Sequence, residues 1–323
     1  MNVNYLIEKG KGRKYIKLSI RINPEVSNKE LLFARQLGVD CVYTWVKENQ
    51  LDYKFLNNLR KKVNEQGLEL YNVGNFDLGK SPEIHLALPG REEKIDRFKS
   101  FIKNLGKAEI NTTTFTWEPA GVWSSGKKEI RGAGTRYVDQ KELEKRSLIF
   151  EREYTRKELW DNFRYFIKEI IPVAEKADVR LALHPNDPPV PSLGGVPCLI
   201  HNFNHYKKAF EIAESDNLGM EFCVGCWLEG GDKFGNIFRA IKYFGQKSKI
   251  FIVHFRNVSS PLPEFKETFL DNGYMDMERI IKQLKDINYQ GTITPDHVPA
   301  MVGGKKAGTA YSIGYMKALL KRS

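Results

Sequence analysis

The sequence of 323 residues lacks several features that would assign it to a simple class. No apolar run reaches the ~18 residues that suggest a membrane-spanning helix, and the first residues lack the apolar centre of a signal peptide. Only four cysteines are present, too few for a disulfide framework in a chain of this length. These absences predict a protein of the reducing cytoplasm that has no membrane partner.

Two further absences concern nucleotides and nucleic acids. No glycine-rich phosphate-binding fingerprint follows the first predicted strand. The net charge is +11, but the basic residues are scattered and form no long block. We therefore expect no nucleic-acid partner, and the positive charge to be mostly solvated surface that also helps to attract a small anionic substrate.

Short β-rich runs alternate with helical stretches along the whole chain. In the clearest helix, residues 155–177, apolar side chains recur at steps of three and four, and Thr155 and Glu158 have the spacing of a capping box. Apolar strands that alternate with amphipathic helices are typical of a parallel sheet covered by helices. The predicted strands are residues 15–22, 39–46, 68–74, 110–119, 179–185, 218–225, 249–257 and 291–297.

Eight such units predict an α/β fold, a single (β/α)8 TIM barrel over residues 1–323 with long loops after the third and fourth strands. An open, doubly wound sheet is the structural alternative. No linker divides the chain into two domains.

Polar side chains gather where the last four predicted strands end. In a TIM barrel the active site lies at the C-terminal ends of the strands, so these side chains should share one mouth. They are His184 after the fifth strand, Cys223 after the sixth, His254, Arg256 and Asn257 after the seventh, and Asp296 and His297 after the eighth.

His184, Cys223, His254 and Asp296 together predict a metal site, although each alone also fits a structural role. Two imidazoles, a thiolate and a carboxylate suit Mn²⁺, Fe²⁺, Co²⁺, Ni²⁺ or Zn²⁺ better than Ca²⁺. A closed tetrahedron would be structural zinc, whereas the barrel mouth favours a catalytic ion with open positions. Cys223 and Cys226 also have CxxC spacing, but no second CxxC completes a zinc ribbon.

Several polar residues are candidates for contact with the substrate. Arg256 suits two-pronged binding of a carboxylate, or else an ion pair at the barrel rim. Arg136, in the long loop after the fourth strand, either closes over the substrate or lies in a plain surface loop. Asn257 is a further candidate. Asn186, in the proline-rich stretch "HPNDPPVP", either supports the site beside His184 together with Asp187 or caps a turn.

These residues lie in segments that resemble a known family. "HPNDPP" with "LGGVP" resembles the HPDDPP…GLPR segment of D-mannonate dehydratase, and "FCVGCWLEGGD" resembles its CTGSLG segment. "HFRNV" resembles its HFRN, and "TPDH" resembles its RPDH. The similarity runs in order from about residue 68 to the end of the chain. The family belongs to the xylose-isomerase-like TIM barrels.

The resemblance implies a chemistry and a set of roles. It implies Mn²⁺, or a similar divalent metal, at His184, Cys223, His254 and Asp296. It implies that D-mannonate, a small anionic sugar acid, loses water to give 2-keto-3-deoxy-D-gluconate. The family's acid–base groups fall on His297 and Tyr311, without a decision on which is the acid. It also implies a homodimer or a larger homo-oligomer.

The chain departs from the family pattern around the expected substrate. "IRINP" stands where the family has an Arg-Trp-Tyr-Gly-like segment, so Arg21 is the residue that matches. Asn186 replaces an acidic residue, Cys226 a serine and Val298 a glycine. Three alternatives therefore stay open: a sugar isomerase or epimerase on the same barrel, a catalytically silent carbohydrate-binding relative, and a nucleic-acid enzyme, which would need a richer cluster of ligands.

Overall fold

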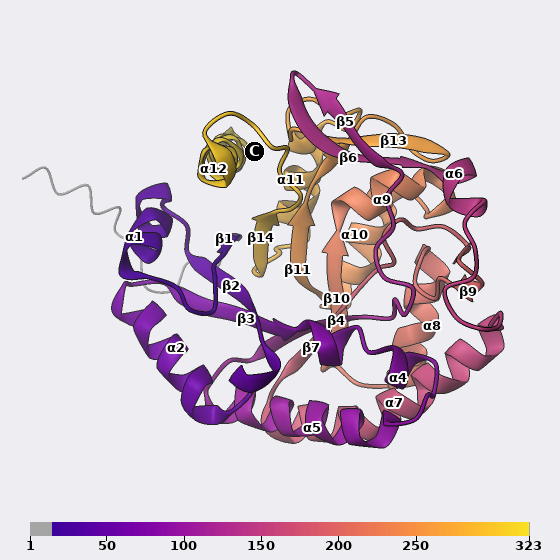
Figure 1. The fold of residues 1–323 in the computed structure, drawn as a ribbon. Helices are drawn as coiled ribbons and strands as arrows, with labels where there is room; N and C mark the ends of the chain where they lie inside the picture. Colours follow the sequence, from indigo (N-terminus) through magenta and orange to yellow (C-terminus); the bar gives the residue numbers. More distant parts are fainter. Residues whose placement is uncertain (1–14, 323) are drawn as a thin grey trace, which may run out of the picture.

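The computed structural model describes residues 15–322 and shows a parallel barrel (Figure 1). Its eight strands lie in the order β3-β2-β1-β14-β11-β10-β7-β4, and every backbone ladder between them is parallel. The predicted TIM barrel is confirmed. The strands are β1 (Lys17–Arg21), β2 (Cys41–Val46), β3 (Glu69–Asn75), β4 (Thr112–Thr116), β7 (Arg180–His184), β10 (Leu218–Cys223), β11 (Ile250–Phe255) and β14 (Thr292–Pro295).

Each barrel strand leads to a helix of the outer layer (Figure 1). The predicted capping box is present, because the Thr155 side chain accepts from the backbone N–H of Glu158 and Glu158 bonds back to Thr155. The helices are α1 (Asn28–Leu37), α2 (Tyr53–Glu65), α5 (Arg91–Lys107), α7 (Arg156–Ala177), α8 (Phe203–Ala213), α10 (Ile237–Gln246), α11 (Met277–Asp286) and α12 (Gly304–Arg322).

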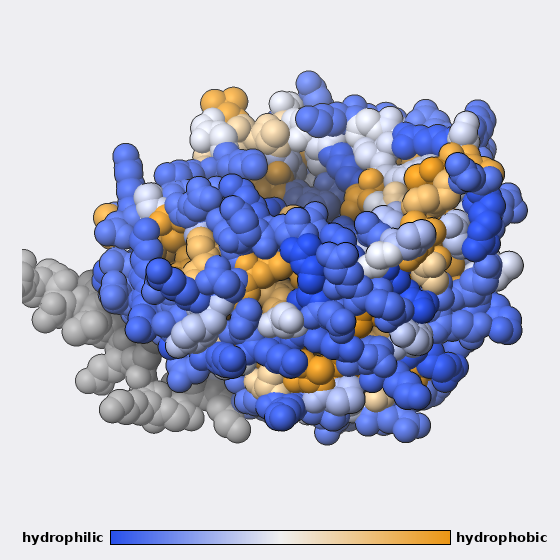
Figure 2. Space-filling model, turned by 60° about the horizontal axis from the view of Figure 1, so that its bottom comes forward, coloured by the Kyte–Doolittle hydropathy of each residue, from blue (hydrophilic) through white to orange (hydrophobic). Residues whose placement is uncertain are grey.

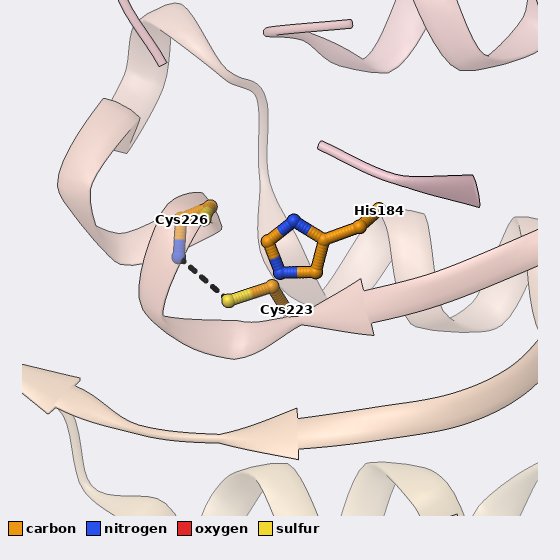
Figure 3. Close-up of side chains that lie close together, drawn as sticks. All are labelled: His184, Cys223 and Cys226. Atoms are coloured by element: carbon orange, nitrogen blue, oxygen red, sulfur yellow. Dashed lines mark hydrogen bonds between the residues drawn. The ribbon is translucent and has the colours of Figure 1, made fainter. Parts of the chain in front are cut away.

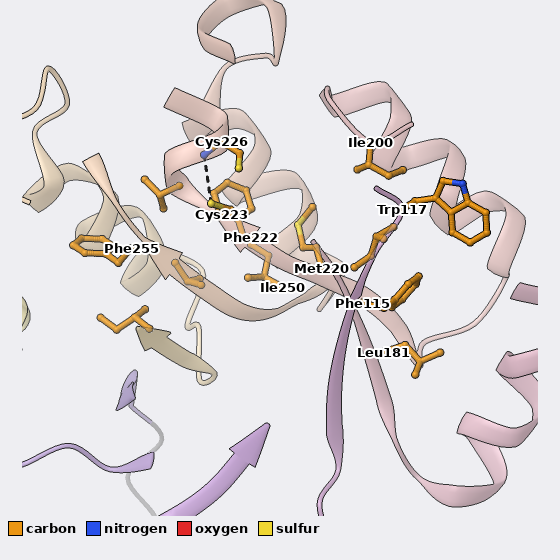
Figure 4. Packing of buried hydrophobic residues seen from close by; sticks show 14 of the residues in the cluster. Phe115, Trp117, Leu181, Ile200, Met220, Phe222, Cys223, Cys226, Ile250 and Phe255 are labelled. Carbon is orange, nitrogen blue, oxygen red and sulfur yellow. Dashed lines mark hydrogen bonds between the residues drawn. The ribbon is translucent and has the colours of Figure 1, made fainter. Parts of the chain in front are cut away.

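The apolar core lies between the strands and these helices (Figure 4). The ring of Phe115 in β4 packs against Phe98 of α5 and Phe166 of α7, with ring centroids 6.5 and 5.8 Å apart. The surface in Figure 2 is largely hydrophilic, with small separate apolar patches and a hollow near its upper rim. None of the helices within residues 15–322 is long and apolar enough to cross a membrane.

The barrel closes between β3 and β4 in a different way from the other strand pairs. These strands form the two ends of the hydrogen-bonded order, so no backbone ladder joins them in the described chain. Instead, Nδ2 of Asn72 in β3 donates to Oγ1 of Thr114 in β4 at 2.9 Å, and both side chains are buried. A side-chain hydrogen bond thus connects the two edges.

A second sheet covers part of the barrel end, and the sequence did not predict it. It has the order β12-β13-β6-β5 and is antiparallel (Figure 1). The segment expected as a plain loop after the fourth strand contains a hairpin, whose first strand is mostly exposed and so lacks the apolar alternation of a half-buried strand. The strands are β5 (Gly126–Ile130), β6 (Ala133–Asp139), β12 (Asn257–Val258) and β13 (Glu264–Thr268).

Short elements occupy the remaining connections. Two of them, α3 and α9, follow barrel strands directly and so help to form the mouth. They are η1 (Glu48–Gln50), α3 (Phe76–Gly79), α4 (Pro82–His85), α6 (Gln140–Glu144), β8 (Ser192–Leu193), β9 (Val196–Pro197), α9 (Val224–Gly230) and η2 (Gly231–Lys233).

The close approach of α5 and α7 yields a stability prediction. A Cβ added at Gly106 would lie 2.4 Å from the carbonyl oxygen of Ala177, whereas at Gly314 in α12 it would meet nothing within 4 Å. We expect Gly106→Ala to lower the free energy of unfolding by about 1–3 kcal/mol. The control Gly314→Ala should raise it by about 0.5–1 kcal/mol. Urea unfolding curves measure both, and equal effects of the two substitutions would contradict the prediction.

Candidate active site

The structure brings the predicted metal ligands together at the C-terminal end of the barrel. Nδ1 of His254 lies 3.8 Å from Oδ2 of Asp296, and Sγ of Cys223 lies 4.0 Å from the same oxygen. The rings of His184 and His254 have centroids 5.3 Å apart. Donor atoms lie within 4.8 Å of one another in two overlapping groups, Cys223–His254–Asp296 and His184–Cys223–Cys226. Such spacing fits donors around one ion at about 2.0–2.3 Å from each.

The pKa values of Cys223 and Cys226 are shifted in opposite directions, and the shift favours the thiolate of Cys223 and the thiol of Cys226. Sγ of Cys223 accepts from the backbone N–H of Cys226 at 3.4 Å (Figure 3). Burial alone would raise the pKa of Cys223, but hydrogen bonding with Cys226 and the charge of Arg256 bring that pKa well below 9.0. Burial raises the pKa of Cys226 well above 9.0. Only a thiolate is a strong metal ligand, so Cys223 is the better donor.

His254 has an acidic neighbour that the sequence reasoning missed. Oε1 of Glu221, in β10, lies 2.7 Å from Nε2 of His254, and the carboxylate is buried. Burial alone would lower the pKa of His254, but the charges of Glu221 and Asp296 raise it well above 6.5. Glu221 precedes Cys223 by two residues in the same strand, so alternation of side chains already placed both on one face.

The residues present fit a divalent transition metal. Neither ring nitrogen of His254 makes a hydrogen bond of good geometry, although both are buried. Two imidazoles, a thiolate and carboxylates form a mixed donor set that matches borderline metals. The mouth therefore offers possible divalent metal sites, with His184, Glu221 and His254 forming a further overlapping group of donors.

A buried charge cluster lies behind the metal ligands, consisting of Arg136, Arg256, Asp187, Glu229 and Glu267. Arg256 is 1% exposed and contacts Asp187 at 2.9 Å, Glu229 at 2.8 Å and Glu267 at 3.0 Å. Arg136 lies 2.7 Å from Asp187 and 3.0 Å from Glu267. Neither arginine therefore lies at the rim or in a plain surface loop: both guanidinium groups are inside, bonded to carboxylates.

Two carboxyl groups of this cluster have pKa values that are shifted in opposite directions. Burial raises the pKa of Glu229 well above 4.5, with Asp187 adding to the effect. The charges of Arg136 and Arg256 hold the pKa of Asp187 well below 3.8 in spite of its burial. A proton taken up by this pair therefore binds to Glu229 rather than to Asp187, which reduces the cost of burying this many acidic groups in one place.

His297 stands between the charge cluster and the mouth. Its Nδ1 lies 2.7 Å from Oε1 of Glu267 and also contacts Arg256, while its side chain is 41% exposed. Partial burial lowers the pKa of His297, but Asp296 and Glu267 outweigh it and raise the pKa above 6.5. The residue has a φ of 45°, in the left-handed region that non-glycine residues rarely adopt. Such backbone is maintained where surrounding contacts dictate it.

The two asparagine candidates are turned toward backbone groups. Asn186 donates to the carbonyl of Trp117 at 3.0 Å and accepts from the N–H of Ile200 at 2.7 Å. Asn257 donates to the carbonyls of Leu270 and Met275 at 3.1 and 2.8 Å. These bonds fix the two loops, so both amides support the mouth through its backbone.

Tyr311 lies apart from the cluster of predicted ligands. It is in α12, where its hydroxyl accepts from Nη2 of Arg131 at 3.4 Å and its ring lies 5.6 Å from that of Phe269. Arg131 also pairs with Asp271 at 2.9 Å. The contacts of Tyr311 thus join α12 to the turn between β5 and β6, and its acid–base role stays a prediction.

Comparison with known proteins identifies the family. The profile of the D-mannonate dehydratase family matches residues 128–320, more than half of the chain. The chain belongs to the D-mannonate dehydratase family. It is 29% identical over 304 residues to a mannonate dehydratase of Thermotoga maritima, with 83% of this chain and 82% of the relative covered. It is 30% identical over 298 residues to that of Thermotoga petrophila, covering 81% of each.

Solved structures confirm the fold. The mannonate dehydratase of Streptococcus suis serotype 2 superposes with a TM-score of 0.86 at 24% identity, covering 96% of this chain and 94% of that one. A D-psicose 3-epimerase of Clostridium cellulolyticum H10 superposes with a TM-score of 0.60 at 17% identity, covering 95% of each. The expected hydro-lyase class is confirmed by membership of the dehydratase family.

The opposite pKa shifts of Cys223 and Cys226 predict how the substitution of each residue affects metal binding. We expect Cys223→Ser to weaken Mn²⁺ or Zn²⁺ binding at least about 100-fold, because it removes the anionic donor. Cys226→Ser, a matched control three residues away, should change the affinity less than about threefold. Competition titration with a chelating dye measures both constants. A larger loss of metal affinity in Cys226→Ser than in Cys223→Ser would contradict the assignment of Cys223 as the metal donor.

The proton on His254 predicts the pH dependence of metal binding. A protonated imidazole cannot bind a metal, and Glu221 and Asp296 raise the pKa of His254 above 6.5. Metal affinity should therefore rise with pH through the neutral range, with proton release on binding at about pH 7. In Glu221→Gln the pKa of His254 falls and the release should shrink. Calorimetry in two buffers of different ionisation enthalpy measures it, and equal release in both proteins would disprove the account.

Proposed function

We propose that this member of the family is a metal-dependent dehydratase that converts D-mannonate into 2-keto-3-deoxy-D-gluconate and water. The observation that carries the proposal is the gathering of His184, Cys223, His254 and Asp296 beside His297 at the mouth of a barrel of this family. The cytoplasmic location and the homo-oligomeric assembly remain predictions from the sequence.

The reaction removes a proton from C2 and a hydroxyl group from C3. The C2 proton is hard to remove because the neighbouring carboxylate is already negative. A divalent ion held by His184, Cys223, His254 and Asp296 would stabilise the charge that develops on the carboxylate. Mn²⁺ is our first choice, and Fe²⁺, Co²⁺, Ni²⁺ and Zn²⁺ suit the same donors.

The residues of the chain supply the proton transfers. We assign His297 a proton exchange with the substrate; its support is that Glu267 holds its Nδ1 at 2.7 Å and that the side chain is partly exposed. Tyr311 is the second acid–base group that the family resemblance implies. When the C2 proton moves to a base and the C3 hydroxyl leaves with a proton from an acid, the enol product becomes the 2-keto acid.

The charge cluster positions these groups. Arg256 touches Asp296 at 3.2 Å as well as Asp187 and Glu267, so one guanidinium aligns a proposed metal ligand, the partner of His297 and the loop after β7. We assign Arg256 and Arg136 to this positioning role, and the contact with the substrate that the sequence suggested for them stays a prediction.

Turnover of purified protein tests the proposal. With Mn²⁺ and D-mannonate we expect formation of a 2-keto-3-deoxy acid, and His254→Ala should reduce kcat/KM by at least about 1,000-fold because the metal is lost. The control His205→Gln, in the outer helix α8, should stay within about threefold of the unaltered protein.

The product decides between the alternatives. A product with the same mass as the substrate would indicate an isomerase or epimerase, and turnover in metal-stripped protein would contradict the metal dependence. A panel of other aldonates and uronates distinguishes a changed substrate from a changed reaction.

A further inference from the structure

An aromatic pair stands at the barrel mouth, and neither ring belongs to the site described above. Trp45 is near the end of β2 and Phe76 begins α3, directly after β3. Their rings are stacked, with centroids 4.0 Å apart and planes 7° from parallel. Phe76 is 42% exposed, so the outer part of this pair is open to a ligand.

The backbone around the pair holds it rigidly. A Cβ at Gly74 would lie 2.6 Å from the indole of Trp45, so only glycine lets the indole lie against β3. Asn75 donates to the carbonyl of Val46 at 2.9 Å and accepts from the N–H of Leu78 at 2.9 Å. These bonds tie the start of α3 to the end of β2. A rigid aromatic surface binds a ligand with little loss of side-chain entropy.

Two cations flank Phe76. The guanidinium of Arg21 lies 6.0 Å from the ring centroid, and Nζ of Lys80 lies 5.8 Å from it. Lys80 pairs with the buried carboxylate of Glu118 at 3.0 Å. Arg21 is exposed and forms no ion pair with a carboxylate among residues 15–322. Arg21 is thus the cation whose hydrogen-bond donors remain available to a ligand.

The pair and Arg21 lie across the mouth from the metal ligands. In the barrel order, β2 is four positions from β10, so these two strands lie on opposite sides of the barrel (Figure 1). Trp45 is near the C-terminal end of β2, and Cys223 is the last residue of β10. Tyr43 lies between Arg21 and the metal ligands. It is in register with Arg21 of the neighbouring strand, and its ring centroid is 6.4 Å from that of His254. For a chain molecule bound at one end by the metal ligands, Phe76 and Arg21 are thus on the far side of the mouth.

We propose that Phe76, supported by Trp45, and Arg21 form the subsite for the distal end of the sugar-acid chain. The C–H groups of the chain pack on the ring of Phe76, and the terminal oxygen atoms accept hydrogen bonds from Arg21. Sites of this kind combine an aromatic wall with a few polar groups that fix orientation. This inference rests on the proposed function, since it takes a sugar acid as the ligand.

Acids of different length test the subsite. Dissociation constants are measured by calorimetry with Mn²⁺ present and in a His297→Asn background, which stops turnover. D-Mannonate reaches the subsite, whereas L-erythronate, a four-carbon acid with the same C2 and C3 configuration, ends before it. We expect Phe76→Ala and Arg21→Met each to weaken the binding of D-mannonate about 5- to 10-fold and the binding of L-erythronate less than twofold. Tyr165→Ala, an exposed aromatic of the outer helix α7, is the matched control.

A third ligand distinguishes a terminal hydroxyl group from a terminal carboxylate. D-Mannarate carries a carboxylate at both ends, and a charged acceptor bonds more strongly to a guanidinium. Arg21→Met should therefore weaken the binding of D-mannarate about 30-fold or more.

Two results would overturn the subsite: equal weakening of the four- and six-carbon acids, or unchanged binding of D-mannonate in both variants. Failure of the proposed function looks different, because the protein with His297 intact then turns over no acid while the dissociation constants still report on Phe76 and Arg21.

Discussion

The pairing of Arg256 with buried carboxylates is the interaction on which the mouth depends. A guanidinium that is 1% exposed has almost no contact with water, so its charge must be balanced by protein acceptors, which here bond to both of its Nη atoms. Its partners come from the loop after β7, from α9, from β13 and from the end of β14. Segments distant in sequence are therefore held in one arrangement, and the second sheet is fixed onto the barrel through Glu267.

The same cluster explains why the metal ligands and His297 are aligned in advance. Glu267 holds His297 while Arg256 contacts Asp296, so the strained backbone at His297 is maintained by charged contacts on both sides. The raised pKa of Glu229 makes this residue the member of the cluster that takes up a proton most readily. Removal of one arginine or carboxylate from the cluster would leave a buried charge without its partner. A substitution at one of these residues would therefore also disturb the others.

Much of the barrel and the set of polar residues at its mouth could be predicted from the sequence, because both depend on patterns within short segments of the chain. Apolar runs located the strands within a few residues, and strand ends located His184, Cys223, His254 and Asp296. Glu229 and Glu267 were missed because nothing nearby in sequence marks them: their shared partner, Arg256, is 27 and 11 residues away from them. The exposed β5 strand lacks a periodic pattern, and the placement of Arg136 depends on it. Interactions between distant segments are decided by packing in three dimensions.

The barrel has a seam between β3 and β4, where the Asn72–Thr114 hydrogen bond stands in place of a backbone ladder. Backbone amides along a seam exchange with solvent through small openings that do not require the other strand pairs to separate. Phe76 and Glu118 follow the two strands that border it. The aromatic wall opposite the metal ligands is therefore rigid within itself, while the strand that precedes Phe76 can separate from β4 without breaking a backbone ladder.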